Sequence, residues 1–200
     1  MIIGFDFDNT LIDYTNSFKK LVKKKKLVPE KFNKNKITIR NYLRKKNLEN
    51  KWTILQGEIY GNAIMDAEIY DGVKNTFRYI LQNNIKIKIV SHKTQYPYMG
   101  RKVDLRLSAL KWIEKNILNQ ISNTNFSKSD IFFENTIKDK IKKIQELSCD
   151  IYVDDLPEIL NLLPNKIQKI LFSPISNDYK NYNYKVMQSW TEFKKIINLK

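Results

Sequence analysis

Apolar and polar positions follow two different periods along this chain, one typical of strands and one typical of helices. Five short runs rich in β-branched and aromatic residues predict buried strands, at residues 2–8, 85–91, 130–134, 150–155 and 168–173. In the other segments, apolar residues recur at three- and four-residue spacing. This spacing predicts amphipathic helices over residues 73–83, 105–118, 138–147, 156–163 and 190–199. Strands that alternate with helices indicate an α/β protein with a doubly wound parallel sheet.

The segment that follows the first strand has a different character. From Asp13 to about residue 70 the chain is rich in lysine, and apolar residues such as Phe18, Leu21 and Val22 keep helical spacing. A length of 200 residues, 42% of them hydrophobic, is enough for one buried core with a small insertion. We therefore predict a helical subdomain at residues 13–70, inserted into a core made of residues 1–12 and 71–200.

Composition adds expectations about location and partners. The net charge is +15, but lysine is spread over the whole chain, which indicates a general compositional bias more than a local nucleic-acid patch. A positive field would still favour a phosphorylated substrate. The single cysteine, Cys149, excludes an internal disulfide and suits a reducing compartment. No apolar run approaches the roughly 18 residues of a membrane span, so we expect a cytoplasmic protein without a membrane partner. The oligomeric state stays open.

Polar side chains follow three of the predicted strands. Asp6 and Asp8 come at the end of the first strand, Ser91 ends the second, and Asp154 and Asp155 end the fourth. The carboxyl ends of parallel strands meet at one edge of a sheet, where α/β proteins bind their ligands. Burying a carboxylate is costly unless it is paired or binds a metal. The sequence therefore predicts that these carboxylates face each other across a divalent cation.

These stretches resemble the motifs of the haloacid dehalogenase-like (HAD) superfamily. "FDFDNTL" resembles its first motif, D-x-D-x-T, and "KIVSHK" is similar to its second, a strand that ends in Ser or Thr. "DIYVDDLPEIL" resembles the fourth motif, and "TIKDKIKKIQEL" offers the lone lysine of the third. The resemblance covers residues 1–12 and 71–173. It implies a Rossmann-like core, and the insertion at residues 13–70 would be a small helical cap of the first cap class.

The resemblance also implies roles for the acidic residues. Asp6 would be the nucleophile that forms an aspartyl-phosphate, and Asp8 would be the general acid and base. Mg²⁺ would bind the Asp6 carboxylate, the Asp8 backbone carbonyl and one acid of the pair Asp154 and Asp155. Asp155 fits that ligand position slightly better than Asp154.

Phosphate-binding groups follow from the same resemblance. Ser91, with the backbone amides near Asn9 and His92, would hold the phosphate oxygens that are not transferred. The motif lysine is either Lys140 or Lys138, and Lys140 matches the family layout better. A catalytic role for the His92 ring is not favoured, because no triad partner is evident in the sequence.

Together these features predict a Mg²⁺-dependent phosphatase that acts on a small phosphorylated metabolite, such as a sugar phosphate, a nucleotide or a small alcohol phosphate. Three alternatives stay open. The first is a phosphomutase and the second a phosphatase for polynucleotide ends. The third is a basic nucleic-acid-binding module that keeps the fold without turnover.

Overall fold

A computed structural model describes residues 1–32, 35–121, 124–174 and 182–197. The chain divides into two compact units. The first, called the core unit here, consists of Met1–Ile12, Ile69–Lys93 and Glu114–Lys200. The second, the helical unit, consists of Asp13–Glu68 and Thr94–Ile113. The last residues of the helix predicted at 190–199 lie outside the described residues.

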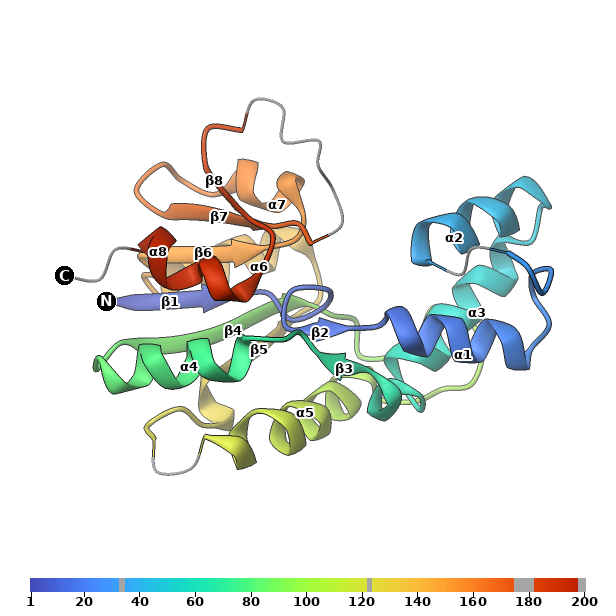
Figure 1. The fold of residues 1–200 in the computed structure, drawn as a ribbon, viewed down its shortest axis with the longest axis horizontal. Helices are drawn as coiled ribbons and strands as arrows, with labels where there is room; N and C mark the ends of the chain where they lie inside the picture. Colours follow the sequence, from blue (N-terminus) through green and yellow to red (C-terminus); the bar gives the residue numbers. More distant parts are fainter. Residues whose placement is uncertain (33–34, 122–123, 175–181, 198–200) are drawn as a thin grey trace. The chain divides into compact units, whose positions relative to one another are not determined.

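The core unit is built on one parallel sheet with the strand order β5-β4-β1-β6-β7-β8 (Figure 1). The strands are β1 (Ile2–Phe5), β4 (Lys86–His92), β5 (Ile131–Glu134), β6 (Ile151–Asp154), β7 (Gln168–Phe172) and β8 (Lys185–Met187). The predicted α/β class with a parallel, Rossmann-like sheet is therefore confirmed. The edge strand β8 was not predicted, because three residues with a lysine at one end carry almost no β pattern.

One face of the sheet is covered by aromatic packing. The Phe5 ring of β1 lies 5.1 Å from Phe77, 5.6 Å from Trp190 and 5.8 Å from Phe193, measured between ring centroids. These partners come from helices at both ends of the core sequence: α4 (Val73–Gln82), η4 (Trp190–Glu192) and α8 (Phe193–Ile197). Phe5 thus anchors the central strand on this face.

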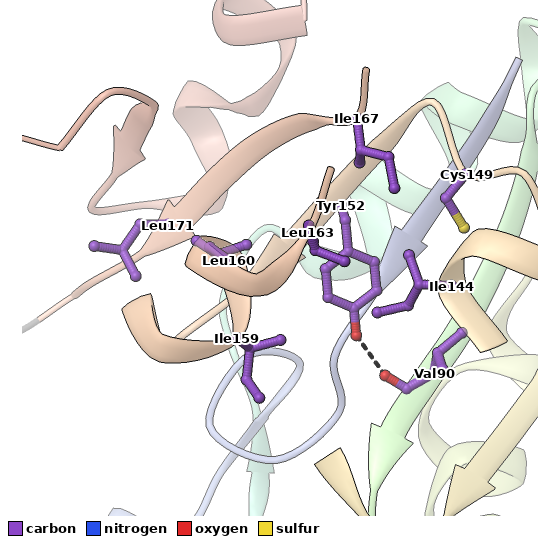
Figure 2. Close-up of a cluster of buried hydrophobic side chains, with 9 residues drawn as sticks. All are labelled: Val90, Ile144, Cys149, Tyr152, Ile159, Leu160, Leu163, Ile167 and Leu171. Atoms are coloured by element: carbon purple, nitrogen blue, oxygen red, sulfur yellow. Dashed lines mark hydrogen bonds between the residues drawn. The ribbon is translucent and has the colours of Figure 1, made fainter. Parts of the chain in front are cut away.

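The opposite face carries a second cluster, drawn in Figure 2 around Tyr152 of β6. Its hydroxyl donates a hydrogen bond to the backbone carbonyl of Val90 in β4. The helices of this face are α6 (Ile137–Glu146) and α7 (Pro157–Leu162). Cys149 is a buried member of the cluster, and burial raises the pKa of its thiol to about 11. Helices therefore cover both faces, as a doubly wound sheet requires. The core unit also contains two short 3₁₀ turns, η2 (Leu118–Gln120) and η3 (Lys128–Asp130).

The helical unit contains the predicted amphipathic helices of residues 13–68. They are α1 (Thr15–Lys24), α2 (Lys36–Lys45), α3 (Glu49–Tyr60) and the short η1 (Ile64–Asp66). The Phe18 ring of α1 stacks on Trp52 of α3 with centroids 5.5 Å apart. A separate two-stranded ribbon is formed by β2 (Ile12–Asp13) and β3 (Glu68–Ile69).

Residues 94–113, which sequence analysis assigns to the core, cluster with the helical unit. They include most of α5 (Leu105–Asn116). The indole of Trp112 donates a 3.0 Å hydrogen bond to the carbonyl of Ala67. Gly61 directly follows α3, and a Cβ there would lie 2.5 Å from Cγ1 of Val103, so only glycine permits this close approach. These contacts depend on tertiary packing that the period of the sequence does not reveal.

None of the helices in the described parts of the chain combines the length and the apolar character that crossing a bilayer requires.

Candidate active site

The parallel register brings the ends of β1, β4 and β6 to one rim of the core unit. Phe5 pairs with Val153 on one side and with Ile89 on the other. The next residue, Asp6, continues the β1–β6 ladder, because its N–H donates to the carbonyl of Val153 at 2.9 Å. From β4, the Ser91 hydroxyl donates to Oδ1 of Asp6 at 2.9 Å. The sheet itself therefore brings these predicted site residues together.

Lys140 reaches the same rim from the first turns of α6. Thr136 caps this helix by accepting the N–H of Asp139 at 3.1 Å. The Lys140 ammonium lies 2.6 Å from Oδ1 of Asp6 and 2.6 Å from Oδ2 of Asp154, and the residue is only 2% exposed. Lys138 is exposed. Of the two candidate lysines, Lys140 is the one that contacts the carboxylates.

This buried triad is held together by charge. Burial would lower the pKa of Lys140, but the neighbouring charges of Asp6 and Asp154 outweigh burial and raise that pKa above its usual value. Burial raises the pKa of Asp154 to about 7, against the lowering effect of Lys140 and together with the repulsion from Asp6. The single positive charge of Lys140 therefore does not compensate two buried carboxylates, and the result is a raised pKa at Asp154.

The second acidic pair is positioned by the turn into α7. Oδ1 of Asp154 accepts the N–H of Leu156 at 2.9 Å, and α7 begins at the following residue, Pro157. Asp155 is part-buried, and its Oδ1 lies 3.4 Å from the hydroxyl of Thr10. Thr10 belongs to the first motif, so this contact joins the β1 end to the β6 end.

A tight turn follows Asp6 and sets the position of the rest of the first motif. Leu11 donates its N–H to the carbonyl of Phe7 at 3.0 Å, and Asn9 adopts a left-handed backbone with φ of 59°. Asparagine tolerates this conformation better than most residues. The N–H of Asn9 donates to the carbonyl of Ile12 at 3.1 Å. In this arrangement the backbone N–H of Asn9 already makes a hydrogen bond inside the turn. Phosphate binding by Asn9 stays a prediction.

His92 has a different environment from Ser91. Its side chain is exposed, and its Nε2 lies 2.9 Å from the carbonyl oxygen of Asn135. Successive residues of a strand point to opposite sides, which explains why His92 and Ser91 diverge. The predicted use of the His92 backbone amide stays a prediction, and its ring contacts the loop before α6.

Lys93 lies at the site but is not among the predicted site residues. Its side chain is 3% exposed, and its ammonium lies 2.8 Å from Oδ2 and 3.1 Å from Oδ1 of Asp8. Its N–H donates to the carbonyl of Glu134 at 2.9 Å, which extends the β4–β5 pairing. A signal was available in the sequence, because residues two apart on a strand share a side and Ser91 was already a candidate.

We expect Lys93→Met to lower kcat of any phosphatase activity by about 10- to 100-fold, because the variant loses the cation that orients Asp8. KM should change much less if Lys93 acts through Asp8, and steady-state kinetics separates the two. Lys86→Met, which removes an exposed lysine from the start of β4, is the matched control. Equal losses in the two variants would contradict a specific role for Lys93.

The carboxylates of this rim fit a hard divalent cation. Asp6, Asp154 and Asp155 each offer an oxygen, and these atoms lie within 4.8 Å of one another. Oxygen ligands alone are typical of Mg²⁺, Ca²⁺ or Mn²⁺ sites. The two acidic pairs carry four negative charges when ionised, whereas the two lysines that contact them carry two positive charges. The remaining two negative charges match one divalent ion.

No protein-family model and no curated protein matches this sequence. Solved structures do match its fold. A "predicted phosphatase" from Clostridium acetobutylicum has a TM-score of 0.64 at 15% identity, covering 99% of this chain and 98% of its own. A haloacid dehalogenase-like family hydrolase from Streptococcus pneumoniae has a TM-score of 0.63 at 16% identity, with 98% of both chains covered. A HAD hydrolase from Entamoeba histolytica has a TM-score of 0.54 at 16% identity, with 96% of this chain and 94% of its own covered.

The chain has the fold of the HAD hydrolases. The resemblance read from the sequence motifs is thus confirmed for the fold, over nearly the whole chain. The four carboxylates of Asp6, Asp8, Asp154 and Asp155, called the acidic rim here, lie at the carboxyl ends of β1 and β6 in this HAD fold. Ser91 and Lys140 contact Asp6 there. The individual roles of these residues stay predictions.

Proposed function

We propose that this protein is a Mg²⁺-dependent phosphomonoester hydrolase that works through an aspartyl-phosphate on Asp6. One observation carries the proposal. Ser91 and Lys140 both donate to Oδ1 of Asp6, whereas no described residue donates to its Oδ2. The carboxylate is therefore held in a fixed orientation with one oxygen left for a substrate or a cation. Such preorganisation suits a nucleophile more than a structural ion pair.

In the first step, an oxygen of Asp6 attacks the phosphorus and forms a new O–P bond. The bond from phosphorus to the leaving alkoxide breaks, and Asp8 gives that oxygen a proton. Lys140 offsets part of the charge that gathers on the transferred group, and the Ser91 hydroxyl adds a hydrogen-bond donor at the same place.

In the second step, water attacks the phosphorus of the aspartyl-phosphate and gives its proton to Asp8. The Asp6–phosphate bond breaks, so inorganic phosphate leaves and both aspartates regain their initial states. Lys93 keeps the Asp8 carboxylate in place. When bound by Asp6, Asp154 and Asp155, Mg²⁺ would supply the positive charge that lets an anionic nucleophile approach an anionic phosphate.

Topology and charge support the proposed substrate class. The helical unit inserts most of its residues between β1 and α4, where the first cap class of HAD proteins carries its cap. A cap of this small size favours a small phosphorylated metabolite. The net charge of +15 favours an anionic substrate in general and leaves polynucleotide ends as the second candidate.

The test is release of inorganic phosphate from p-nitrophenyl phosphate and a panel of sugar, nucleotide and alcohol phosphates, with Mg²⁺ and with EDTA. Steady turnover that EDTA abolishes supports the hydrolase. Activity only with a bisphosphate primer would instead indicate a phosphomutase. Activity confined to oligonucleotide ends, with a steep salt dependence, would instead indicate a phosphatase for polynucleotide ends. A panel without any Mg²⁺-dependent turnover would refute the proposal.

We expect Mg²⁺ to raise the melting temperature more at about pH 8 than at about pH 5. In the metal-free protein the pKa of Asp154 is about 7, above its usual value near 3.8. A raised folded-state pKa means that the contribution of Asp154 to stability is present at low pH and is lost as pH rises towards 7. Bound Mg²⁺ would offset the repulsion between the ionised carboxylates of Asp154 and Asp6. Near pH 5 Asp154 is protonated, so protons compete with Mg²⁺ for this carboxylate. Thermal scans check this, with NaCl at matched ionic strength as control. Equal shifts at both pH values would contradict it.

A further inference from the structure

A pocket of about 420 Å³ lies within the helical unit. Its walls come from α1, the end of α3, η1 and the loop before α5, and none of the acidic-rim residues lines it. This volume falls in the range of small-molecule sites, roughly 300–1,000 Å³, and far exceeds that of one water molecule. We call it the α1 pocket.

Ser17 is the unusual member of this pocket. The residue is 1% exposed, and its hydroxyl makes no hydrogen bond with any described residue. A serine inside a helix commonly bonds the carbonyl four residues earlier, but Ser17 does not do so here. Burying a polar group without a partner destabilises a protein, so alanine would be the more stable choice if packing were the only role of this position. The hydroxyl therefore points to a ligand that enters the pocket.

The charges around Ser17 define the chemistry of that ligand. Lys20 and Lys24 lie three and seven residues after Ser17, on the same side of α1. Arg101 faces them from the loop before α5. None of these three cations makes an ion pair within the described ranges 1–32, 35–121, 124–174 and 182–197.

The two acidic residues of the pocket do not neutralise the charge of these three cations. Glu58 is already paired with Lys25 at 2.7 Å, so its charge is neutralised. Asp66 of η1 remains, as one acid against three cations. It can accept a hydrogen bond from a hydroxyl group but cannot cancel the positive field.

The loop that carries Arg101 is packed closely against α3. A Cβ at Gly57 would lie 2.8 Å from the Cβ of Pro97 and 3.3 Å from the carbonyl of Met99. Glycine at this position lets the loop approach the helix closely. Arg101 follows Met99 by two residues, so the backbone that presents it is fixed before any ligand binds.

We propose that the α1 pocket is a binding site for a small hydroxylated anion, in which a carboxylate or phosphate group contacts Lys20, Lys24 and Arg101. The Ser17 hydroxyl donates to the same anionic group, and Asp66 accepts a hydrogen bond from a hydroxyl of the ligand. This site goes beyond the proposed hydrolase activity, because it needs no residue of the acidic rim.

The test is an NMR titration of the full chain with inorganic phosphate, with malate and, as a neutral probe, with glycerol. Backbone amides of residues 15–24, 57–66 and 99–103 report on the α1 pocket, and those of residues 5–10 and 89–93 report on the acidic rim. Saturable shifts in the first set with phosphate or malate support the site, and the stronger of the two identifies the anionic group. Shifts that do not saturate, or that glycerol reproduces, overturn it. Because the two sets are read separately, a protein without phosphatase activity can still pass or fail this test.

A charge-matched pair of variants makes the assignment specific. Lys20→Gln/Lys24→Gln should weaken the saturable binding about tenfold or more, because two charge-assisted contacts are lost. Lys19→Gln/Lys23→Gln removes the same charge from exposed positions of the same helix and should leave the dissociation constant within about twofold. Equal weakening in both pairs would show a diffuse field and overturn the site.

Ser17→Ala separates a ligand contact from a packing role. We expect the dissociation constant to rise about tenfold, while the melting temperature of the ligand-free protein stays the same or rises, since an unpartnered hydroxyl is removed. Arg101→Gln is the second variant, and it should also weaken binding about tenfold. Unchanged affinity in both variants would overturn the proposal.

Discussion

Replacing Asp6 by Asn is expected to lower phosphate release by about 10⁴-fold or more, with the fold intact. The amide is nearly the same size as the carboxylate and can still accept hydrogen bonds from Ser91 and Lys140. It has no anionic oxygen to attack phosphorus, so the aspartyl-phosphate cannot form. Hydrolysis of p-nitrophenyl phosphate, with far-UV circular dichroism to check the fold, measures both parts of the prediction.

Glu146→Gln is the control for loss of one negative charge. Glu146 lies on the exposed side of α6, and its ion pairs with other described residues are those with Lys142 and Lys143 of the same helix. Its turnover should stay within about twofold of wild type. Peptide mapping of acid-quenched wild-type protein should find the phosphate on the peptide that contains Asp6. A variant Asp6→Asn that keeps more than about 1% of the wild-type rate would exclude Asp6 as the nucleophile. Any oligonucleotide binding should stay nearly unchanged in this variant, because the substitution removes no cation that could contact a phosphate.

The parts of this site that could be predicted from sequence are those fixed by strand periodicity. Asp6 follows a strand whose residues point alternately to the two faces, and Asp154 ends a second strand of the same kind. Parallel pairing of those strands then places both carboxylates at one edge, whatever the rest of the chain does. The α/β class and the candidate acids depend only on this local pattern, so both could be predicted from the sequence alone.

Other features depend on contacts between distant segments, which a local pattern does not encode. Lys138 and Lys140 look alike in a lysine-rich helix, and only the placement of α6 beside β1 and β6 separates them. The burial of Lys93 depends on Asp8 in another segment. Likewise, residues 94–113 join the helical unit through close packing of the 97–103 loop on α3, which no periodicity reveals. Three-residue β8 gains its strand geometry from its neighbour β7.

Replacing Lys140 by Met should be the most destabilising single change at the acidic rim, lowering the free energy of unfolding by about 3–5 kcal/mol. Asp6 and Asp154 would then be left buried without their shared cation. Because native proteins are stable by only about 5–15 kcal/mol, this loss is large. Denaturant titration in the absence of Mg²⁺ measures it. Lys138→Met removes an exposed lysine from the same helix and should change stability by less than about 0.5 kcal/mol.

The pH dependence distinguishes lost charge compensation from lost packing. In wild type, Lys140 lowers the pKa of Asp154, so its removal raises that pKa further above the unfolded value. A group whose folded-state pKa is raised loses its contribution to stability as pH rises, and protonation restores it at low pH. The difference between Lys140→Met and wild type should therefore be greatest above pH 7 and should narrow towards about pH 5. A cavity left by the shorter side chain would cost the same at every pH, so a pH-independent difference would contradict the electrostatic role of Lys140.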